Sequence, residues 1–197
     1  VDSALDSVRD MNTALENFCS PDDFPMDNVN LLTIKAEVMT ILAARTQIYE
    51  IEEITKAPPL VTCHRSHIAQ VMVNLVLNAC EAIDRKKARN SDVTQEFEEI
   101  HGKLILSLEE KVYGDQNGIL FTIEDNGEGI DPEIKNRIQE PFFTTKPAGQ
   151  GAGLGLPISR TIITKHKGVL AISNSEVLGG AKVSIWIPDS QETTTDV

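Results

Sequence analysis

The 197-residue chain carries a formal net charge of −12, and 41% of its residues are apolar, as in ordinary globular proteins. The acidic excess argues against binding to nucleic acid or to an anionic membrane surface, because both need a basic face. No apolar run reaches the length of a membrane span, and three scattered cysteines favour a reducing cytoplasm. Since the chain begins at Val1 and not at methionine, we expect it to be a part of a longer protein.

The spacing of apolar residues predicts helices and strands in alternation. Helices are expected where apolar residues recur every three or four positions, and strands where they alternate or are β-branched. The predicted helices cover 1–19, 31–45, 66–87, 131–139 and 156–167, and the predicted strands cover 25–29, 47–55, 60–62, 103–113, 118–124, 169–174 and 181–187. The polar stretch between 85 and 102 is expected to be a frayed helix end and a surface loop.

Composition divides the chain into a long body and two short ends. Prolines at 21 and 25 mark a linker over 21–26, after the terminal helix. The polar, aperiodic residues 190–197 are expected to be a disordered tail. One folded domain is therefore predicted over residues 27–189.

The stretch from Glu140 to Leu156, EPFFTTKPAGQGAGLGL, has the most unusual composition. Its closely spaced glycines remove side chains where backbone must approach something else. The stretch leads into a predicted helix, and the unpaired N–H groups at a helix N-terminus attract anions. This pattern favours a phosphate site, although flexible loops have a similar composition.

Two polar motifs precede the glycine-rich stretch. Asn74 and Asn78 lie four positions apart on a predicted helix, so both amides are expected on one face. By themselves they read as core asparagines bonded to backbone, because unsatisfied buried amides are costly. Asp125 begins DNGEGI at the end of a predicted strand, where it also suits a turn.

Taken in order, four motifs resemble the N, G1, F and G2 boxes of sensor histidine kinases. They are Asn74…Asn78, Asp125-x-Gly127-x-Gly129, Phe142-Phe143 and Gly151-x-Gly153-x-Gly155. The resemblance covers roughly residues 24–188. It implies the Bergerat ATP-binding fold, an α/β fold of the two-layer α+β kind. A mixed sheet covered on one face by helices is then expected, preceded by an N-terminal helix.

The same resemblance implies roles for individual residues. ATP and Mg²⁺ would be the cofactors, with Mg²⁺ on Asn78, catalysis by Asn74, Asn78 and Lys146, and the adenine amino group on Asp125. Further nucleotide contacts are implied at Gly127, Gly129, Ile130, Phe143, Thr145, Gly151, Gly153, Leu154, Gly155 and Leu156. The F box would anchor a mobile lid, although two core phenylalanines give the same pattern. Lys146 and Arg160 are left open between a phosphate contact and a solvated side chain.

The implied function is transfer of the ATP γ-phosphate to a histidine on a dimerisation domain of a homodimeric parent, and from there to a response regulator. Residues 1–20 resemble the end of a dimerisation helix. The alternatives are an ATPase or nucleotide-driven switch of the gyrase, Hsp90 or MutL kind, or a serine kinase of the same superfamily. Those relatives carry a glutamate base where this chain has Asn74. Because an amide cannot take a proton, we expect poor hydrolysis.

Three features depart from common patterns. No histidine occurs before His64, so the phosphoacceptor box of the resembling family is absent. Glu81 stands where many relatives carry a lysine, which predicts the loss of a phosphate contact. Cys63, His64, His67 and Cys80 fit no common zinc spacing, so histidines on the surface at a helix start are the preferred interpretation.

Overall fold

The computed structural model describes residues 26–56, 60–93, 101–135, 137–138, 140–146 and 152–189, with side chains described to residue 90 in the second range. The helix predicted at 1–19, most of the linker and the tail at 190–197 lie outside these residues. The strands are β1 (Asp27–Asn30), β2 (Glu50–Thr55), β3 (Leu60–Cys63), β4 (Lys103–Glu110), β5 (Gly118–Asp125), β6 (Val169–Asn174) and β7 (Ala181–Pro188). The helices are α2 (Leu31–Ile41), α3 (Ala43–Thr46), α4 (Arg65–Val93) and α5 (Gly155–Lys165).

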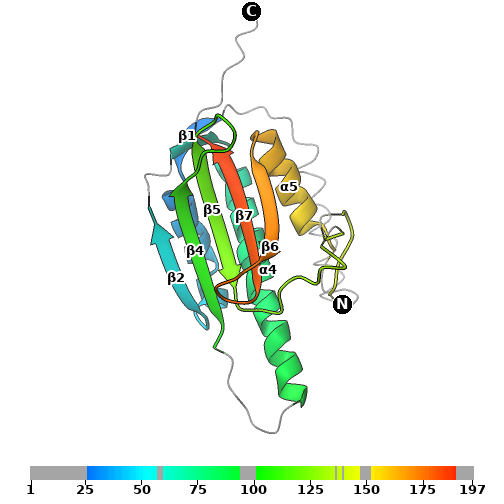
Figure 1. The fold of residues 1–197 in the computed structure, drawn as a ribbon. Helices are drawn as coiled ribbons and strands as arrows, with labels where there is room; N and C mark the ends of the chain where they lie inside the picture. The colour runs from blue at the N-terminus through cyan, green and yellow to red at the C-terminus, as the bar shows by residue number, and fades with distance from the viewer. Residues whose placement is uncertain are drawn as a thin grey trace, which may run out of the picture.

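A five-stranded mixed sheet in the order β2-β4-β5-β7-β6 forms one layer. β2 runs parallel to β4, and the other neighbours are antiparallel. β1 and β3 form a separate antiparallel pair. Figure 1 shows the helices gathered behind one face of the sheet. This arrangement confirms the predicted two-layer α+β fold.

The core lies between the sheet and α4. Ile119, Phe121 and Ile123 alternate along β5 and join Met72 and Leu75 of α4 in one buried cluster. Each of these side chains is at most 3% exposed. Burying such a side chain contributes about 1.5–3 kcal/mol, so this contact fixes the position of α4 on the sheet. None of the described helices is long and apolar enough to cross a membrane.

The long helix α4 extends beyond the helix predicted at 66–87. Its polar second half has partners that no local pattern shows. Arg85 and Arg89 form ion pairs with Glu128, and Lys86 donates to the carbonyl of Asn126 at 2.7 Å. These contacts hold helical turns that were expected to fray.

The helix predicted at 31–45 is interrupted at Leu42, which has φ −90° and ψ 6°. The turn brings Arg45 of α3 against Asp84 of α4 and Tyr49, whose hydroxyl donates to Asp84 at 2.8 Å. The helix predicted at 131–139 is also wrong, because the described residues there form turns. Asp131 nevertheless caps the first turn by accepting from the Glu133 N–H at 2.9 Å.

Helix α5 ends at Lys165, two residues before the predicted end at 167. Lys167, with φ +56°, occupies the left-handed position after the helix, where glycine is usual. The Gly168 N–H bonds the Ile163 carbonyl and the Lys167 N–H bonds the Thr164 carbonyl, both at 2.9 Å, which is a Schellman motif. Gly168 is required for space, because a Cβ there would lie 2.3 Å from the Trp186 carbonyl oxygen.

Opposite effects on stability are therefore expected at these two neighbours. Lys167→Gly should stabilise the domain by about 0.5–1 kcal/mol, because relief of the left-handed backbone exceeds the entropy that glycine adds to the unfolded chain. Gly168→Ala should destabilise it by about 1–3 kcal/mol through the clash with β7. Urea unfolding of both variants measures the two shifts. The same sign for both would contradict the assignment of the motif.

Candidate functional site

A cavity of about 470 Å³ opens between α4, α5 and the ends of β5 and β7. This volume suits a drug-sized or nucleotide-sized ligand. The predicted site residues that line it are Asn74, Asn78, Asp125, Gly129, Ile130, Phe143, Thr145, Lys146, Gly153, Leu154, Gly155 and Leu156. Gly127 is not among the lining residues and packs against α4, where a Cβ would lie 2.7 Å from the backbone of Ala82. Gly151 lies outside the described residues.

Asp125 forms one end of the cavity. Asp125 is only 4% exposed. Its Oδ1 accepts hydrogen bonds from the N–H groups of Gly127 at 2.8 Å and Ala181 at 3.1 Å. Burial raises the pKa of the carboxyl, and this effect outweighs the two backbone donors and the nearby cations Lys86 and Arg85. Since Oδ1 is held by backbone, Oδ2 is the atom left to accept from a ligand.

The two asparagines of α4 form a relay of amides. Asn78 Nδ2 donates to Asn74 Oδ1 at 3.4 Å, and Asn74 Nδ2 donates to Ser159 Oγ on α5 at 2.8 Å. Gly155 leaves room for the relay, because a Cβ there would lie 2.2 Å from Asn74 Oδ1. Asn74 therefore ties α4 to α5 and orients its neighbour. This arrangement leaves the side-chain oxygen of Asn78, Oδ1, to contact a ligand in the cavity.

The F and G2 boxes meet at the cavity mouth. The Phe142 N–H donates to the Gly153 carbonyl at 3.1 Å, and a Cβ on Gly153 would lie 2.5 Å from the Phe143 carbonyl oxygen. Phe143 is half-buried beneath the guanidinium of Arg137, 4.6 Å from its ring centre, whereas Phe142 is 65% exposed. Phe142 and Phe143 are therefore not a pair of core residues. The middle of the predicted lid, 147–151, lies outside the described residues.

Helix α5 begins at the cavity without a side-chain cap. Leu154 occupies the N-cap position and makes no capping hydrogen bond. Leu154, Gly155 and Leu156 all line the cavity, so the first N–H groups of the helix border it. Such a helix start favours an anionic group. Arg160 is exposed on α5 and is not among the described residues that line the cavity.

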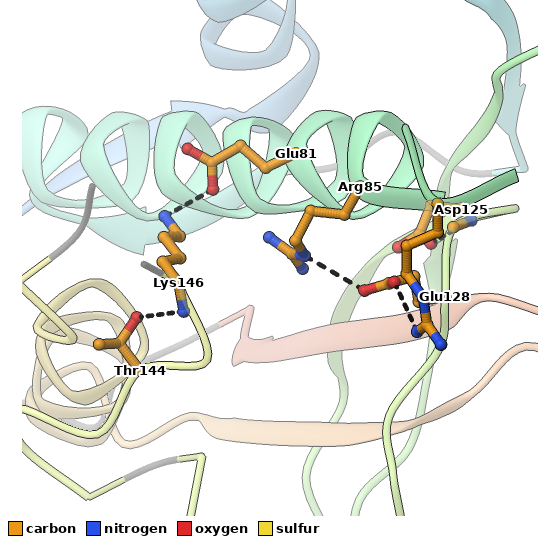
Figure 2. A network of polar contacts seen from close by, with 8 residues as sticks. Glu81, Arg85, Asp125, Glu128, Thr144 and Lys146 are labelled. Atoms are coloured by element: carbon orange, nitrogen blue, oxygen red, sulfur yellow. Dashed lines mark hydrogen bonds and ion pairs between the residues drawn. The ribbon is translucent and has the colours of Figure 1, made fainter. Parts of the chain in front are cut away.

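Figure 2 shows Glu81 and Arg85 of α4 in ion pairs with residues of other segments. Glu81 Oε2 lies 2.5 Å from Lys146 Nζ, and Arg85 Nε lies 3.3 Å from Glu128 Oε2. The Lys146 N–H also donates to Thr144 Oγ1 at 3.1 Å. Lys146 is therefore a cavity residue with an acidic partner and not a solvated lysine. Sequence reasoning missed both ion pairs and Ser159, because their partners lie on other elements.

The histidines and cysteines do not form a second site in the described part of the chain. His166 is fully buried, and its Nε2 accepts the His64 N–H at 3.0 Å. His64 and His67 are half-buried beside it, so the prediction of surface histidines is wrong. Burial raises the pKa of the Cys63 and Cys80 thiols to about 11, which keeps them unreactive. No group of three or more His, Cys, Asp or Glu among the described residues could hold a metal ion.

Comparison with known proteins shows the family to which the chain belongs. The sequence profile of histidine kinase-, DNA gyrase B- and HSP90-like ATPases matches residues 63–191. Sporulation kinase D of Bacillus subtilis is 33% identical over 165 residues, which are 82% of this chain and 28% of that protein. Sensor histidine kinase ZraS of Salmonella typhimurium is 28% identical over 186 residues, 93% of this chain and 36% of that protein. The chain thus spans about a third of the length of these relatives.

A solved structure matches the whole fold. The catalytic domain of histidine kinase ThkA, in a nucleotide-free form, superposes with a TM-score of 0.66 at 29% identity. The superposition covers 84% of this chain and 97% of that domain. The cavity described above therefore lies in the fold of a histidine kinase catalytic domain.

Proposed function

Since the chain belongs to the histidine kinase-, DNA gyrase B- and HSP90-like ATPase family, we propose that it is the ATP-binding catalytic domain of a two-component sensor histidine kinase. The observation that carries the proposal is the meeting of Asp125, Asn78 and the start of α5 in one cavity. These groups suit the three parts of Mg²⁺-ATP. We call the end of the cavity at Asp125 the adenine end and the end at the start of α5 the phosphate end.

Asp125 is suited to recognise adenine. A carboxylate accepts hydrogen bonds and cannot donate them, so Oδ2 would accept the exocyclic amino group. Guanine presents a carbonyl oxygen at the equivalent position and would be repelled. The close packing of Gly127 against α4 and the left-handed backbone of Gly129, with φ +75°, keep bulky side chains out of this end. Selection of adenine nucleotides over guanine nucleotides follows.

The residues at the other end fit Mg²⁺ held largely by phosphates. Magnesium prefers oxygen ligands and is commonly bound by one or two protein groups together with the phosphates of a nucleotide. The relay through Asn74 presents the carbonyl oxygen of Asn78 for that purpose. Mg²⁺ would neutralise charge that develops on the phosphates, while α5 N–H groups and Lys146 position them.

Two observations favour a kinase over a dedicated ATPase. Asn74 uses its amide in the relay and has no basic group that could activate water. The acidic residues that line the described cavity are Asp125 and Glu81; Asp125 lies at the adenine end and Glu81 is paired with Lys146. A phosphoryl acceptor would then come from another part of the protein. We propose a histidine on a dimerisation domain of a homodimeric, cytoplasmic kinase region, which passes the phosphoryl group to a response regulator.

Calorimetric titration tests the binding step directly. The chain should bind ATP or ADP in the presence of Mg²⁺, more weakly with excess EDTA, and should bind GTP at least about tenfold more weakly than ATP. The discrimination is expected because guanine leaves the buried Asp125 without its donor. Equal affinity for ATP and GTP, or no binding at millimolar nucleotide, would remove the basis of the proposal.

A further inference from the structure

The ion pair between Glu81 and Lys146 joins the long helix α4 to the start of the predicted lid. Glu81 lies three residues after Asn78, so the two side chains are neighbours on the helix face that lines the cavity. Figure 2 shows Lys146 reaching up to Glu81 from the segment that also carries Thr144. The pair therefore stands beside the atom proposed to hold Mg²⁺, at the phosphate end.

The contact is close but incomplete. Glu81 Oε2 is sealed from solvent and has no donor in good hydrogen-bond geometry among the described residues, although Lys146 Nζ lies 2.5 Å away. The attraction is therefore chiefly between charges. Although Oε2 is covered, the side chain of Glu81 is 37% exposed and that of Lys146 is 25% exposed, so water partly screens the pair. Since Oε2 has no hydrogen bond in this arrangement, it can accept one from a new donor when Lys146 moves away.

Charge balance decides what happens when phosphates enter. If Lys146 turned to the phosphates alone, Glu81 would be left as a bare carboxylate beside several negative charges. With Mg²⁺ present, both the phosphates and Glu81 have a positive partner. Lys146 can form ion pairs with the phosphates, and Glu81 can accept hydrogen bonds from water molecules that Mg²⁺ retains. The lysine can change partners at low cost only when the metal accompanies the nucleotide.

We propose that Glu81 is a positioning residue that makes nucleotide binding depend on Mg²⁺. In the nucleotide-free site, Glu81 holds Lys146. When the Mg²⁺-nucleotide binds, Glu81 releases Lys146 and accepts hydrogen bonds from metal-bound water in its place. The inference rests on the proposed Mg²⁺-nucleotide site and deepens it. It also accounts for an acidic residue beside the proposed phosphate site, where a positive charge would attract the phosphates. Lys146 supplies the positive charge, and Glu81 allows Lys146 to contact the phosphates only when these carry Mg²⁺.

The measurement is the affinity for ADP and for a nonhydrolysable ATP analogue, with excess Mg²⁺ and with excess EDTA, by calorimetry. The quantity compared is the ratio of the Kd in EDTA to the Kd in Mg²⁺. Glu81→Gln should lower this ratio about tenfold, mainly by tighter binding in EDTA, because a repelling charge is removed. Lys146→Gln should raise the ratio, because Glu81 then faces the phosphates without a counter-charge.

Opposite changes of this Kd ratio in the two variants distinguish the exchange of Lys146 from a purely structural ion pair. If the pair only fastened the loop to α4, both variants would weaken binding equally with and without Mg²⁺, and that result would overturn the proposal. Glu37→Gln is the matched control, since Glu37 forms a similar exposed pair with Arg65 away from the cavity lining. It should keep the ratio of the wild type, and thermal unfolding confirms that each variant is folded.

The same titrations distinguish failure of the proposed metal site from failure of the role of Glu81. A wild-type chain that binds nucleotide equally with Mg²⁺ and EDTA would remove the proposed metal site together with the role of Glu81. A wild-type chain that depends on Mg²⁺, with both variants keeping its ratio, would leave the metal site standing and remove the role of Glu81. Should Glu81→Gln fail to fold, Lys146→Gln decides alone, since an unchanged or lower ratio contradicts the exchange.

Discussion

Replacing Asp125 with Asn is expected to weaken ATP binding about 10- to 150-fold, which corresponds to about 1.5–3 kcal/mol for a charge-assisted hydrogen bond. The asparagine oxygen can still accept the N–H groups of Gly127 and Ala181, which hold Oδ1 in the wild type. The amide nitrogen is then turned to the cavity, where it presents a donor to the adenine amino group. Calorimetry with ATP measures the loss.

The fold should not suffer from the same substitution. Burial raises the pKa of Asp125 in the folded protein, so its charged form is less stable there than in the unfolded chain. A raised carboxyl pKa means that stability is lost as pH rises from the unfolded value of 3.8 through the folded value. At neutral pH the neutral asparagine removes this cost. The Tm of Asp125→Asn without nucleotide should therefore equal or exceed that of the wild type.

Nucleotide binding should show the matching pH dependence. Below its raised pKa, Asp125 is protonated and loses the charge that strengthens its bond to adenine. Affinity for ATP should thus fall on acidification with a midpoint above the ordinary aspartate value, and Asp125→Asn should lack this step. Asp131→Asn is the control, because Asp131 is exposed and an asparagine keeps its capping bond to Glu133. Unchanged ATP affinity in Asp125→Asn would contradict the assignment of the adenine end.

The cavity could be predicted because its motifs combine local chemistry with a fixed order along the chain. Asp125 ends a strand, Asn74 and Asn78 share a helix face, and glycines precede a helix start, and each of these follows from local spacing. The contacts that give them their roles are tertiary. Ser159 and Gly155 lie on α5, whereas Asn74 lies on α4, and the residue spacing within each helix does not predict that the three meet.

The same limit explains the errors. Residues 131–139 have helical spacing and a good cap, but the described part forms only turns, and its apolar residues Ile134 and Ile138 line the cavity. Loss of a cation was inferred from Glu81 alone, whereas Lys146 places an ammonium on that turn of α4 from a distant segment. Sequence patterns locate the charges along the chain but not across the cavity.

Asn78 should be indispensable for phosphoryl transfer. With a longer chain of this protein that includes a histidine-bearing dimerisation region, incubation with Mg²⁺-ATP should yield an acid-labile, base-stable phosphohistidine. Asn78→Ala in the same protein should lower labelling at least about 100-fold, because it removes the oxygen proposed to hold Mg²⁺. Asn28→Ala is the control: Asn28 is an exposed residue of β1, remote from the cavity lining, and its loss should leave labelling unchanged.

The 197-residue chain by itself should bind ATP and yet fail to phosphorylate itself on histidine. No histidine precedes His64, and His64 is held at the start of α4 by the contact of its backbone N–H with the buried His166. Turnover of ATP to ADP should also be slow, because Asn74 donates and accepts within the relay and cannot take a proton from water. Supplying the dimerisation region as a separate protein should restore labelling of that region. Self-labelling of the isolated chain, or hydrolysis at the median enzyme rate of about 10 per second, would instead favour the ATPase branch of the family.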